Sequence, residues 1–257
     1  MTANRGARMP PKFDRAPIMS RGEWVKLLVG LVAVFALFQG LAEALESVRG
    51  QAGLLVVGAV LAALIGIEWL LFGRSPSAAM GFLGLGRPAG QGMIVAAGLS
   101  GLLLAVIPAY AYLQADTIQG YPGWGWLIPG LFAQAGIAEE ALFRGCLFRH
   151  LRQGRPFWRA AGLTAVPFAL VHLYLFWTLP WPIAAASVLL AISISFPLAY
   201  LFELGGNTIW GPALLHFIVQ GAVKVVIVRG GPVFPLLWLA ASATIPWLAF
   251  AFGRRLK

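Results

Sequence analysis

The nine residues IAEEALFRG, Ile137–Gly145, place two adjacent carboxylates and one guanidinium inside an apolar run long enough to cross a bilayer. A charged side chain near the bilayer centre costs roughly 2.5–3.5 kcal/mol on insertion scales, so three in one run indicate a specific role. Glu140 and Arg144 are four residues apart and share a helical face. Glu139 lies about 100° around the helix from Glu140 and has no basic residue at the following helical spacings. We therefore predict an ion pair between Glu140 and Arg144 and a carboxylate at Glu139 that is available for function.

The composition around this stretch is that of an integral membrane protein. The chain has 257 residues, of which 60% are hydrophobic and 11% charged, and its mean hydropathy is +0.81. Soluble domains carry about 25% charged residues. The net charge of +10 is explained by basic loops that stay on the cytoplasmic side, so no nucleic-acid partner is expected. The single cysteine, Cys146, excludes a disulfide framework and a Cys-rich metal site.

The predicted fold is all-α, a polytopic bundle of about eight transmembrane helices forming one domain over residues 23–252. A basic tail, 1–22, precedes this domain and a second basic tail, 253–257, follows it. Eight apolar segments are each close to the ~20 residues that a spanning helix needs. They are residues 24–45, 51–72, 91–113, 125–149, 157–177, 181–203, 208–228 and 233–252.

The basic residues of the connections predict the topology. If the N-terminus is inside, the inside connections hold Arg74, Arg87, Arg149, Arg152, Arg155 and Arg159, and the outside loops hold Arg49 and Arg229. This bias predicts that both termini face the cytoplasm, with the surrounding lipids those of the cytoplasmic (inner) membrane. His150 borders an arginine-rich loop and is expected to be solvated, and Glu68, near a predicted span end, is expected to lie at the interface.

Three further polar groups lie inside predicted spans at depths similar to that of Glu139. At ~1.5 Å per residue, Glu139 lies roughly 15 Å from its nearest predicted cytoplasmic end, His216 roughly 14 Å and His172 roughly 20 Å. His216 and Gln220 are four apart and share a helical face. We expect these four groups to meet in an intramembrane cavity that opens to the cytoplasm.

This set of side chains is suited to hydrolysis of a peptide bond. A carboxylate beside an imidazole can hold a water molecule and take its proton, so that the oxygen attacks a carbonyl. A second imidazole and a carboxamide can stabilise the resulting oxyanion. Cys146 is interpreted as a small core residue rather than as a nucleophile.

The three motifs resemble those of the CPBP family, the glutamate-dependent CAAX-protease and bacteriocin-processing intramembrane endopeptidases, also called Rce1-like or Abi. The resemblance covers roughly residues 75–228 and rests on Glu139-Glu140-x-x-x-Arg144, Phe168-x-x-x-His172, and His216 with a carboxamide four residues later. It implies an eight-helix fold with a cavity open to the cytosol. It further implies that Glu139 is the general base, that His172 holds the water, and that His216 and Gln220 form the oxyanion site. Glu140, Arg144 and Phe168 are implied to be supporting residues.

One position departs from the family pattern, because Gln220 stands where the family usually has Asn. A glutamine keeps the amide donor on one extra methylene group. A misplacement of about 1 Å can lower a rate about 100-fold, so this position bears on the level of activity.

Two alternatives to a cofactor-free protease remain open from the sequence. Glu139, His172 and His216 could bind zinc as two imidazoles and one carboxylate with an open position, although the sequence lacks an H-E-x-x-H motif. The chain could instead be a catalytically silent membrane scaffold of the same family. A transporter is less consistent with the sequence, because no internal repeat is evident. The expected partner is a membrane-associated, lipidated or leader-bearing peptide or protein substrate.

Overall fold

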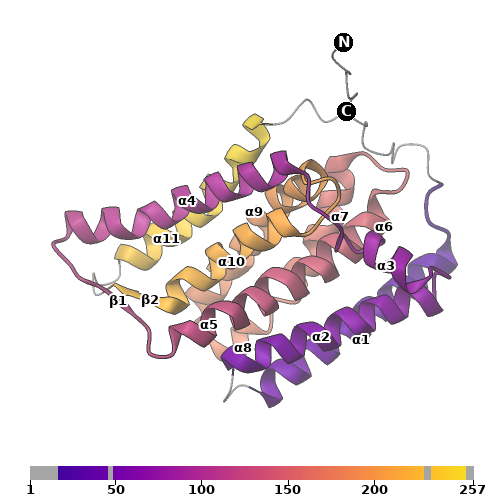
Figure 1. Ribbon diagram of the computed structural model, residues 1–257, viewed down its shortest axis with the longest axis horizontal. Coiled ribbons are helices and arrows are strands. Elements are labelled where there is room, and N and C mark those ends of the chain that lie inside the picture. Colours follow the sequence, from indigo (N-terminus) through magenta and orange to yellow (C-terminus); the bar gives the residue numbers. More distant parts are fainter. Residues whose placement is uncertain (1–16, 46–48, 229–232, 253–257) are drawn as a thin grey trace, which may run out of the picture.

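The computed structural model describes residues 17–45, 49–228 and 233–252 as a helical bundle (Figure 1). Residues 1–16 of the predicted N-terminal tail and the whole predicted C-terminal tail, 253–257, lie outside this description. The longer α-helices are α1 (Arg21–Ala44), α2 (Arg49–Leu70), α4 (Gly90–Leu113), α7 (Phe157–Leu170), α9 (Trp181–Leu204), α10 (Trp210–Val225) and α11 (Val233–Thr244). The shorter ones are α3 (Pro76–Phe82), α5 (Trp124–Leu131), α6 (Arg149–Arg152) and α8 (Leu175–Thr178). A 3₁₀-helical segment, Ile245–Phe252, continues α11.

Six of the described helical segments are long and apolar enough to cross a membrane: Arg21–Ala44, Gly50–Leu70, Gly90–Leu113, Phe157–Thr178, Trp181–Leu204 and Val233–Phe252. The all-α, polytopic prediction is therefore confirmed at this level, whereas the prediction of eight spans is not. The predicted fourth span, 125–149, is divided into short α-helical and π-helical segments. The predicted seventh span, 208–228, contains only the 16 residues of α10, after which the chain becomes extended.

The divided helix carries the acidic motif. It runs from α5 through two π-helical segments, Phe132–Ala138 and Ala141–Phe148, into α6. Glu139 and Glu140 lie between the two π-helical segments. Widened helical turns of this kind are frequent at functional sites.

The divided helix packs near its start and near its end against neighbouring backbones. A Cβ atom on Gly130 would lie 2.1 Å from the carbonyl oxygen of Gly50 in α2, and one on Gly145 would lie 2.2 Å from that of Leu83. Only glycine permits such close approaches, which are common where helices pack within a membrane. The helix that carries the acidic motif is therefore held tightly against α2 and against the residue that follows α3.

The helix α10 lies near the middle of the bundle, where it contacts α4, α9, α5 and the first π-helical segment (Figure 1). The helix α7 packs on α9, and α1 packs on α2 at one edge. Large apolar side chains such as Val32, Leu55 and Ile94 point outward and are exposed. Lipid chains can cover such a surface, because they are as apolar as the side chains themselves.

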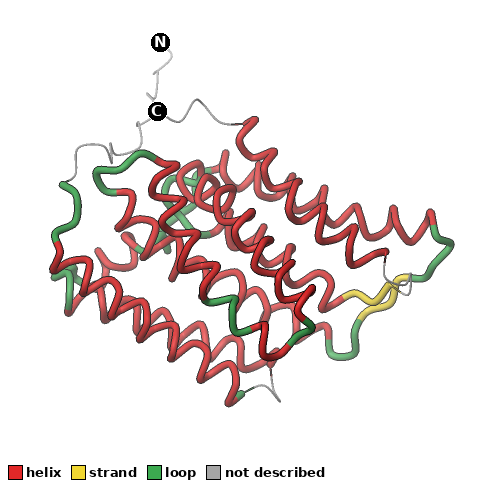
Figure 2. Tube along the Cα trace, turned by 180° about the vertical axis from the view of Figure 1, so that it is seen from behind, coloured by secondary structure: helices red, strands yellow, loops and turns green. Residues whose placement is uncertain are grey.

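A two-stranded antiparallel sheet, which the sequence did not predict, lies at one end of the bundle. Strands β1 (Ile118–Gly120) and β2 (Val226–Val228) pair with Gln119 opposite Ile227. The sheet joins the connection after α4 to the end of α10 (Figure 2). The loops at this end are therefore fixed to the helix that carries His216 and Gln220.

Candidate active site

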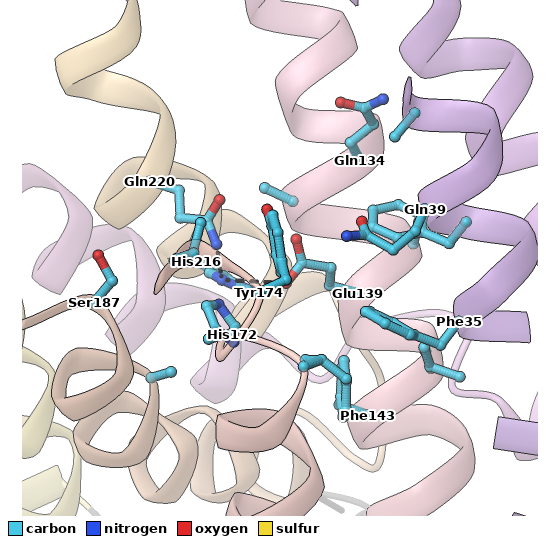
Figure 3. Close-up of a pocket in the computed structure, with 18 of the residues that line it drawn as sticks. Phe35, Gln39, Gln134, Glu139, Phe143, His172, Tyr174, Ser187, His216 and Gln220 are labelled. Carbon is cyan, nitrogen blue, oxygen red and sulfur yellow. Dashed lines mark hydrogen bonds and ion pairs between the residues drawn. The ribbon is translucent and has the colours of Figure 1, made fainter. Parts of the chain in front are cut away.

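A cavity of about 810 Å³ lies between α1, the divided helix, α10 and the chain that links α7 to α9. Its polar lining includes the four residues that the sequence placed at similar depths (Figure 3). These are Glu139, His172, His216 and Gln220. Phe35 and Gln39 of α1 lie across the cavity from them (Figure 3). The structure therefore brings the predicted catalytic residues to one cavity.

Glu139 is the carboxylate that reaches the cavity. Its side chain is 16% exposed, whereas that of its neighbour Glu140 is completely buried. The Oε2 atom of Glu139 lies 3.8 Å from Nε2 of His216. This separation is too long for a direct hydrogen bond but suits a single bridging water molecule. Glu139 therefore has a free acceptor side facing the cavity.

Glu140 forms the predicted ion pair with Arg144 and a second contact that the sequence did not reveal. Its Oε1 atom accepts a hydrogen bond from Arg144 Nη1 at 2.9 Å and another from His216 Nδ1 at 2.7 Å. All three side chains are fully buried. A buried carboxylate of this kind needs both partners, because an unpaired charge in such a place is strongly destabilising.

The contact with Glu140 also fixes the chemistry of His216. Because a carboxylate only accepts hydrogen bonds, Nδ1 of His216 carries the proton. Its Nε2 atom then faces the cavity, where the amide nitrogen of Gln220 lies 3.0 Å away. Gln220 therefore reaches the imidazole from one turn further along α10, despite the extra methylene group relative to asparagine.

The sequence predicted His172 inside a helical span. In the structure, His172 instead lies in the turn that follows α7. The helix α7 ends at Leu170, three residues after Pro167. Nδ1 of His172 donates a hydrogen bond to the carbonyl oxygen of Phe168 at 2.7 Å. The unprotonated Nε2 atom of the neutral ring is thus its hydrogen-bond acceptor.

The ring of Phe168 joins the second motif to the other two. The guanidinium of Arg144 lies over this ring at 4.4 Å, and the rings of His172 and His216 lie 4.9 Å and 5.8 Å away. Phe168 itself is fully buried. It therefore packs against Arg144, His172 and His216 and positions them relative to one another.

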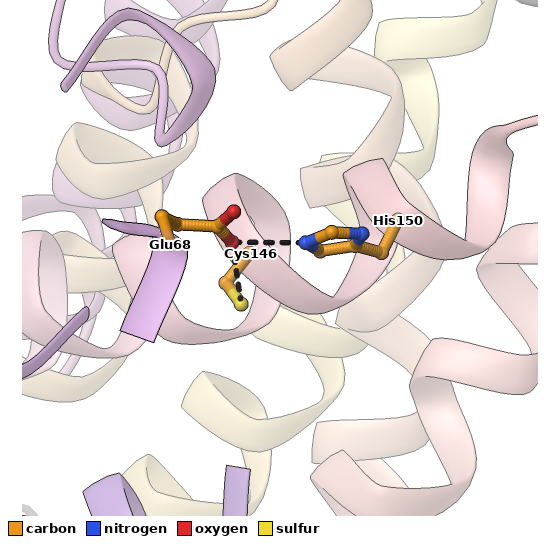
Figure 4. A group of neighbouring side chains, drawn as sticks. All are labelled: Glu68, Cys146 and His150. Carbon is orange, nitrogen blue, oxygen red and sulfur yellow. Dashed lines mark hydrogen bonds and ion pairs between the residues drawn. The ribbon is translucent and has the colours of Figure 1, made fainter. Parts of the chain in front are cut away.

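A second group of potential metal ligands lies where the divided helix packs against α2. Glu68, Cys146 and His150 have ligand atoms within 4.8 Å of one another (Figure 4). Among the residues that the structure describes, Glu139, His172 and His216 do not form such a group. The predicted zinc alternative therefore does not coincide with the metal-capable group that the structure contains.

Glu68 and His150 correct the expectation that the first is interfacial and the second solvated, because each side chain is buried. One oxygen of Glu68 accepts from His150 Nε2 at 2.9 Å and from the thiol of Cys146 at 3.5 Å. The other oxygen accepts from Arg74 at 2.6 Å. Cys146 and His150 are four residues apart on one helical face, which was the available sequence signal. Glu68 lies on α2, and only the packing of α2 against the divided helix brings it next to Cys146 and His150.

The fold and the cavity together define a class: polytopic helical membrane proteins with a carboxylate and imidazoles around an intramembrane cavity. Within this class, residues 121–222 match the family model of the type II CAAX prenyl endopeptidase Rce1-like proteins. This match confirms the family recognition made from the three motifs, all of which fall inside the matched segment. A search among curated proteins found no match.

Proposed function

We propose that the chain is an intramembrane endopeptidase that hydrolyses a peptide bond of a membrane-associated substrate with water activated by Glu139. The Rce1-like family supports a CAAX-type intramembrane protease. The observation that carries the mechanism is the arrangement of Glu139 and His216, 3.8 Å apart on the wall of one cavity. No other described carboxylate shares the cavity with the two imidazoles except Glu43, which lies at the end of α1.

In the proposed reaction, a water molecule binds between Glu139 and the imidazoles. The carboxylate of Glu139 takes one proton as the water oxygen forms a bond to the carbonyl carbon of the substrate. The Nε2 atom of His172, whose ring is oriented by the carbonyl oxygen of Phe168, accepts a hydrogen bond from the second O–H group of that water, and this hydrogen stays on the attacking oxygen. The proton held by Glu139 then passes to the leaving nitrogen when the C–N bond breaks. The site is regenerated without a covalent intermediate.

The oxyanion needs hydrogen-bond donors on the opposite side of the cavity. The amide group of Gln220 lies beside His216 and offers two N–H groups. Nε2 of the neutral His216 ring accepts one of these N–H groups, so this imidazole, held by Glu140 through Nδ1, directs the other N–H group toward the oxyanion. Donors fixed in place before the reaction are typically worth a factor of about 10²–10³ in rate each.

We also propose that this chemistry needs no metal ion. The contacts made by the imidazole Nδ1 atoms and the separation of the three side chains suit activation of a water molecule by a carboxylate. The rival zinc mechanism predicts that a chelator abolishes turnover and that zinc restores it. The scaffold hypothesis predicts that the substitution Glu139→Ala leaves every cleavage product unchanged.

The test uses the purified full-length protein in lipid nanodiscs with a prenylated CAAX peptide, the substrate type that the family description names. Membranes from cells expressing the wild type and the Glu139→Ala variant are compared by quantitative proteomics to find natural substrates. We expect a precursor to accumulate in the variant. If neither assay shows a difference between the two proteins, the proposed function is wrong.

A further inference from the structure

The residues that line the cavity lie toward one end of the bundle. On α1 its lining residues run from Phe35 to Glu43, in the last half of the helix, and on α10 they run from His216 to Lys224, again in the last half. On α9 they run from Ser187 to Ile194, in the first part of the helix. These helix portions all point toward the end where β1 and β2 pair (Figure 1).

The opposite end is closed beneath the catalytic group. Arg144, Phe148, Phe157 and Phe202 are among the largest fully buried side chains. At the same end, Nε of Arg152 donates to Glu203 at 2.6 Å, and Arg149 donates to the carbonyl oxygens of Gly81 and Phe82. Packed aromatic rings and ion pairs thus separate Glu139 from this end.

This closed end is also the arginine-rich end. The chain from the end of α2 to the start of α4, and the chain from α6 to the first turn of α7, lie here and hold Arg74, Arg87, Arg149, Arg152, Arg155 and Arg159. At the cavity end, the basic residues among those that the structure describes are Arg49 at the start of α2 and Lys224, which lines the cavity. By the positive-inside rule, the arginine-rich end faces the cytoplasm.

Two expectations drawn from the sequence therefore exclude each other. If the arginine-rich end is cytoplasmic, the cavity cannot also open to the cytoplasm, because its lining residues lie toward the other end. The first expectation follows from the charge distribution of this chain, whereas the second came from the family resemblance and from depths measured to the nearest cytoplasmic end.

We infer that the cavity opens to the extracytoplasmic side, so that the substrates are membrane-anchored peptides or proteins whose scissile bond lies on that side of the membrane. The inference about substrates rests on the proposed function, but the direction of the opening does not. The polar residues Thr178 and Ser187 line the cavity, Thr178 exposed and Ser187 half-buried, which makes them suitable reporters of the opening.

The experiment measures thiol accessibility in intact bacterial cells that express the full chain. In a Cys146→Ser background, which keeps a hydrogen-bond donor toward Glu68, a single cysteine is introduced by Ser187→Cys. The matched control is Ser77→Cys, an exposed serine in α3 at the arginine-rich end. A membrane-impermeant maleimide is added before or after permeabilisation of the cells.

We expect Ser187→Cys to be labelled equally in intact and permeabilised cells, and Ser77→Cys to be labelled only after permeabilisation. A second cavity variant, Thr178→Cys, should behave like Ser187→Cys and serves if the first variant is poorly expressed. The inference is overturned if the cavity cysteines react only after permeabilisation while Ser77→Cys reacts in intact cells.

The labelling experiment tests the orientation of the cavity, and the cleavage assay tests the chemistry of Glu139, so either claim can be refuted without the other. Labelling needs no turnover, so outside labelling combined with full cleavage by Glu139→Ala would refute the proposed chemistry but leave the orientation intact. Loss of cleavage in Glu139→Ala combined with labelling only from the inside would refute the orientation but leave the chemistry intact.

Discussion

Two clusters that include residues of the divided helix each contain a carboxylate and an imidazole but differ in how their hydrogen bonds are used. Around Glu139, a carboxylate faces a cavity and lies 3.8 Å from an imidazole nitrogen. Around Glu68, a carboxylate accepts hydrogen bonds at 2.9 Å from His150 and at 2.6 Å from Arg74. The first carboxylate has free acceptor capacity, whereas both oxygens of the second are occupied.

This difference distinguishes a reactive site from a structural one. A general base must be able to reach a proton on a substrate or on water, and therefore needs access and a free lone pair. Glu139 meets both conditions. Glu68 is fully buried and joins α2 to the divided helix. A buried carboxylate and imidazole are thus insufficient evidence for catalysis without an adjoining cavity.

The largest expected effect concerns the carboxylate in the cavity. We expect Glu139→Ala to lower turnover of a prenylated peptide by about 10²–10⁴-fold, because general base catalysis is lost. The measurement is the rate of cleavage by purified protein in nanodiscs. Thermal unfolding of the same samples serves as the control, since the ion-pair contact of Glu139 with His216 is long, at 3.8 Å. Wild-type turnover in Glu139→Ala would contradict the assignment of Glu139 as the reactive carboxylate.

The next largest effect concerns the adjacent carboxylate. We expect Glu140→Ala to destabilise the protein by about 3–5 kcal/mol, because Arg144 is left as a buried charge without its partner. The free energy of unfolding can be measured by denaturant titration in detergent micelles. Glu139→Ala is the matched control on the neighbouring residue and should cost much less stability. Equal losses of unfolding free energy in the two variants would show that the different burial of Glu139 and Glu140 does not give them different structural roles.

A smaller effect is expected for the closed cluster. Glu68→Ala removes the shared acceptor of His150, Cys146 and Arg74, and should destabilise the protein by about 1–3 kcal/mol. The turnover of each folded molecule should remain unchanged. Melting temperature and specific activity can be measured on the same preparation. If catalysis is lost while the fold is retained, the closed cluster takes part in the reaction.

The smallest effect is expected from removal of metal ions. Because the proposed reaction uses only side chains and water, treatment with a chelator should leave the rate of cleavage unchanged. Elemental analysis before and after treatment reports whether either cluster binds a metal. Loss of activity that zinc restores would establish the zinc mechanism and exclude the proposed one.

Helical spacing predicted the interactions that occur within one helix. The pair of Glu140 with Arg144 and the shared face of His216 and Gln220 both follow from a separation of four residues. The similar depths of the polar residues also predicted correctly that Glu139, His172 and His216 line one cavity. These features depend only on position along a helix.

Interactions between helices could not be predicted in the same way. The spacing of residues does not specify which helix lies opposite, so the contacts of Glu140 with His216 and of Glu68 with His150 were missed. The interruption after Leu170 and the two π-helical segments also depend on packing. Depth alone likewise could not indicate from which end of the bundle the cavity is lined.

The most direct test of the comparison measures cleavage by the wild type, Glu139→Gln and Glu68→Gln in the same lipid bilayer with the same prenylated peptide. Glutamine preserves the shape of each side chain and removes its charge. We predict that Glu139→Gln loses turnover while Glu68→Gln retains it per folded molecule. Retained turnover in Glu139→Gln, with a fold unchanged from the wild type, would contradict the assignment of Glu139 as the general base.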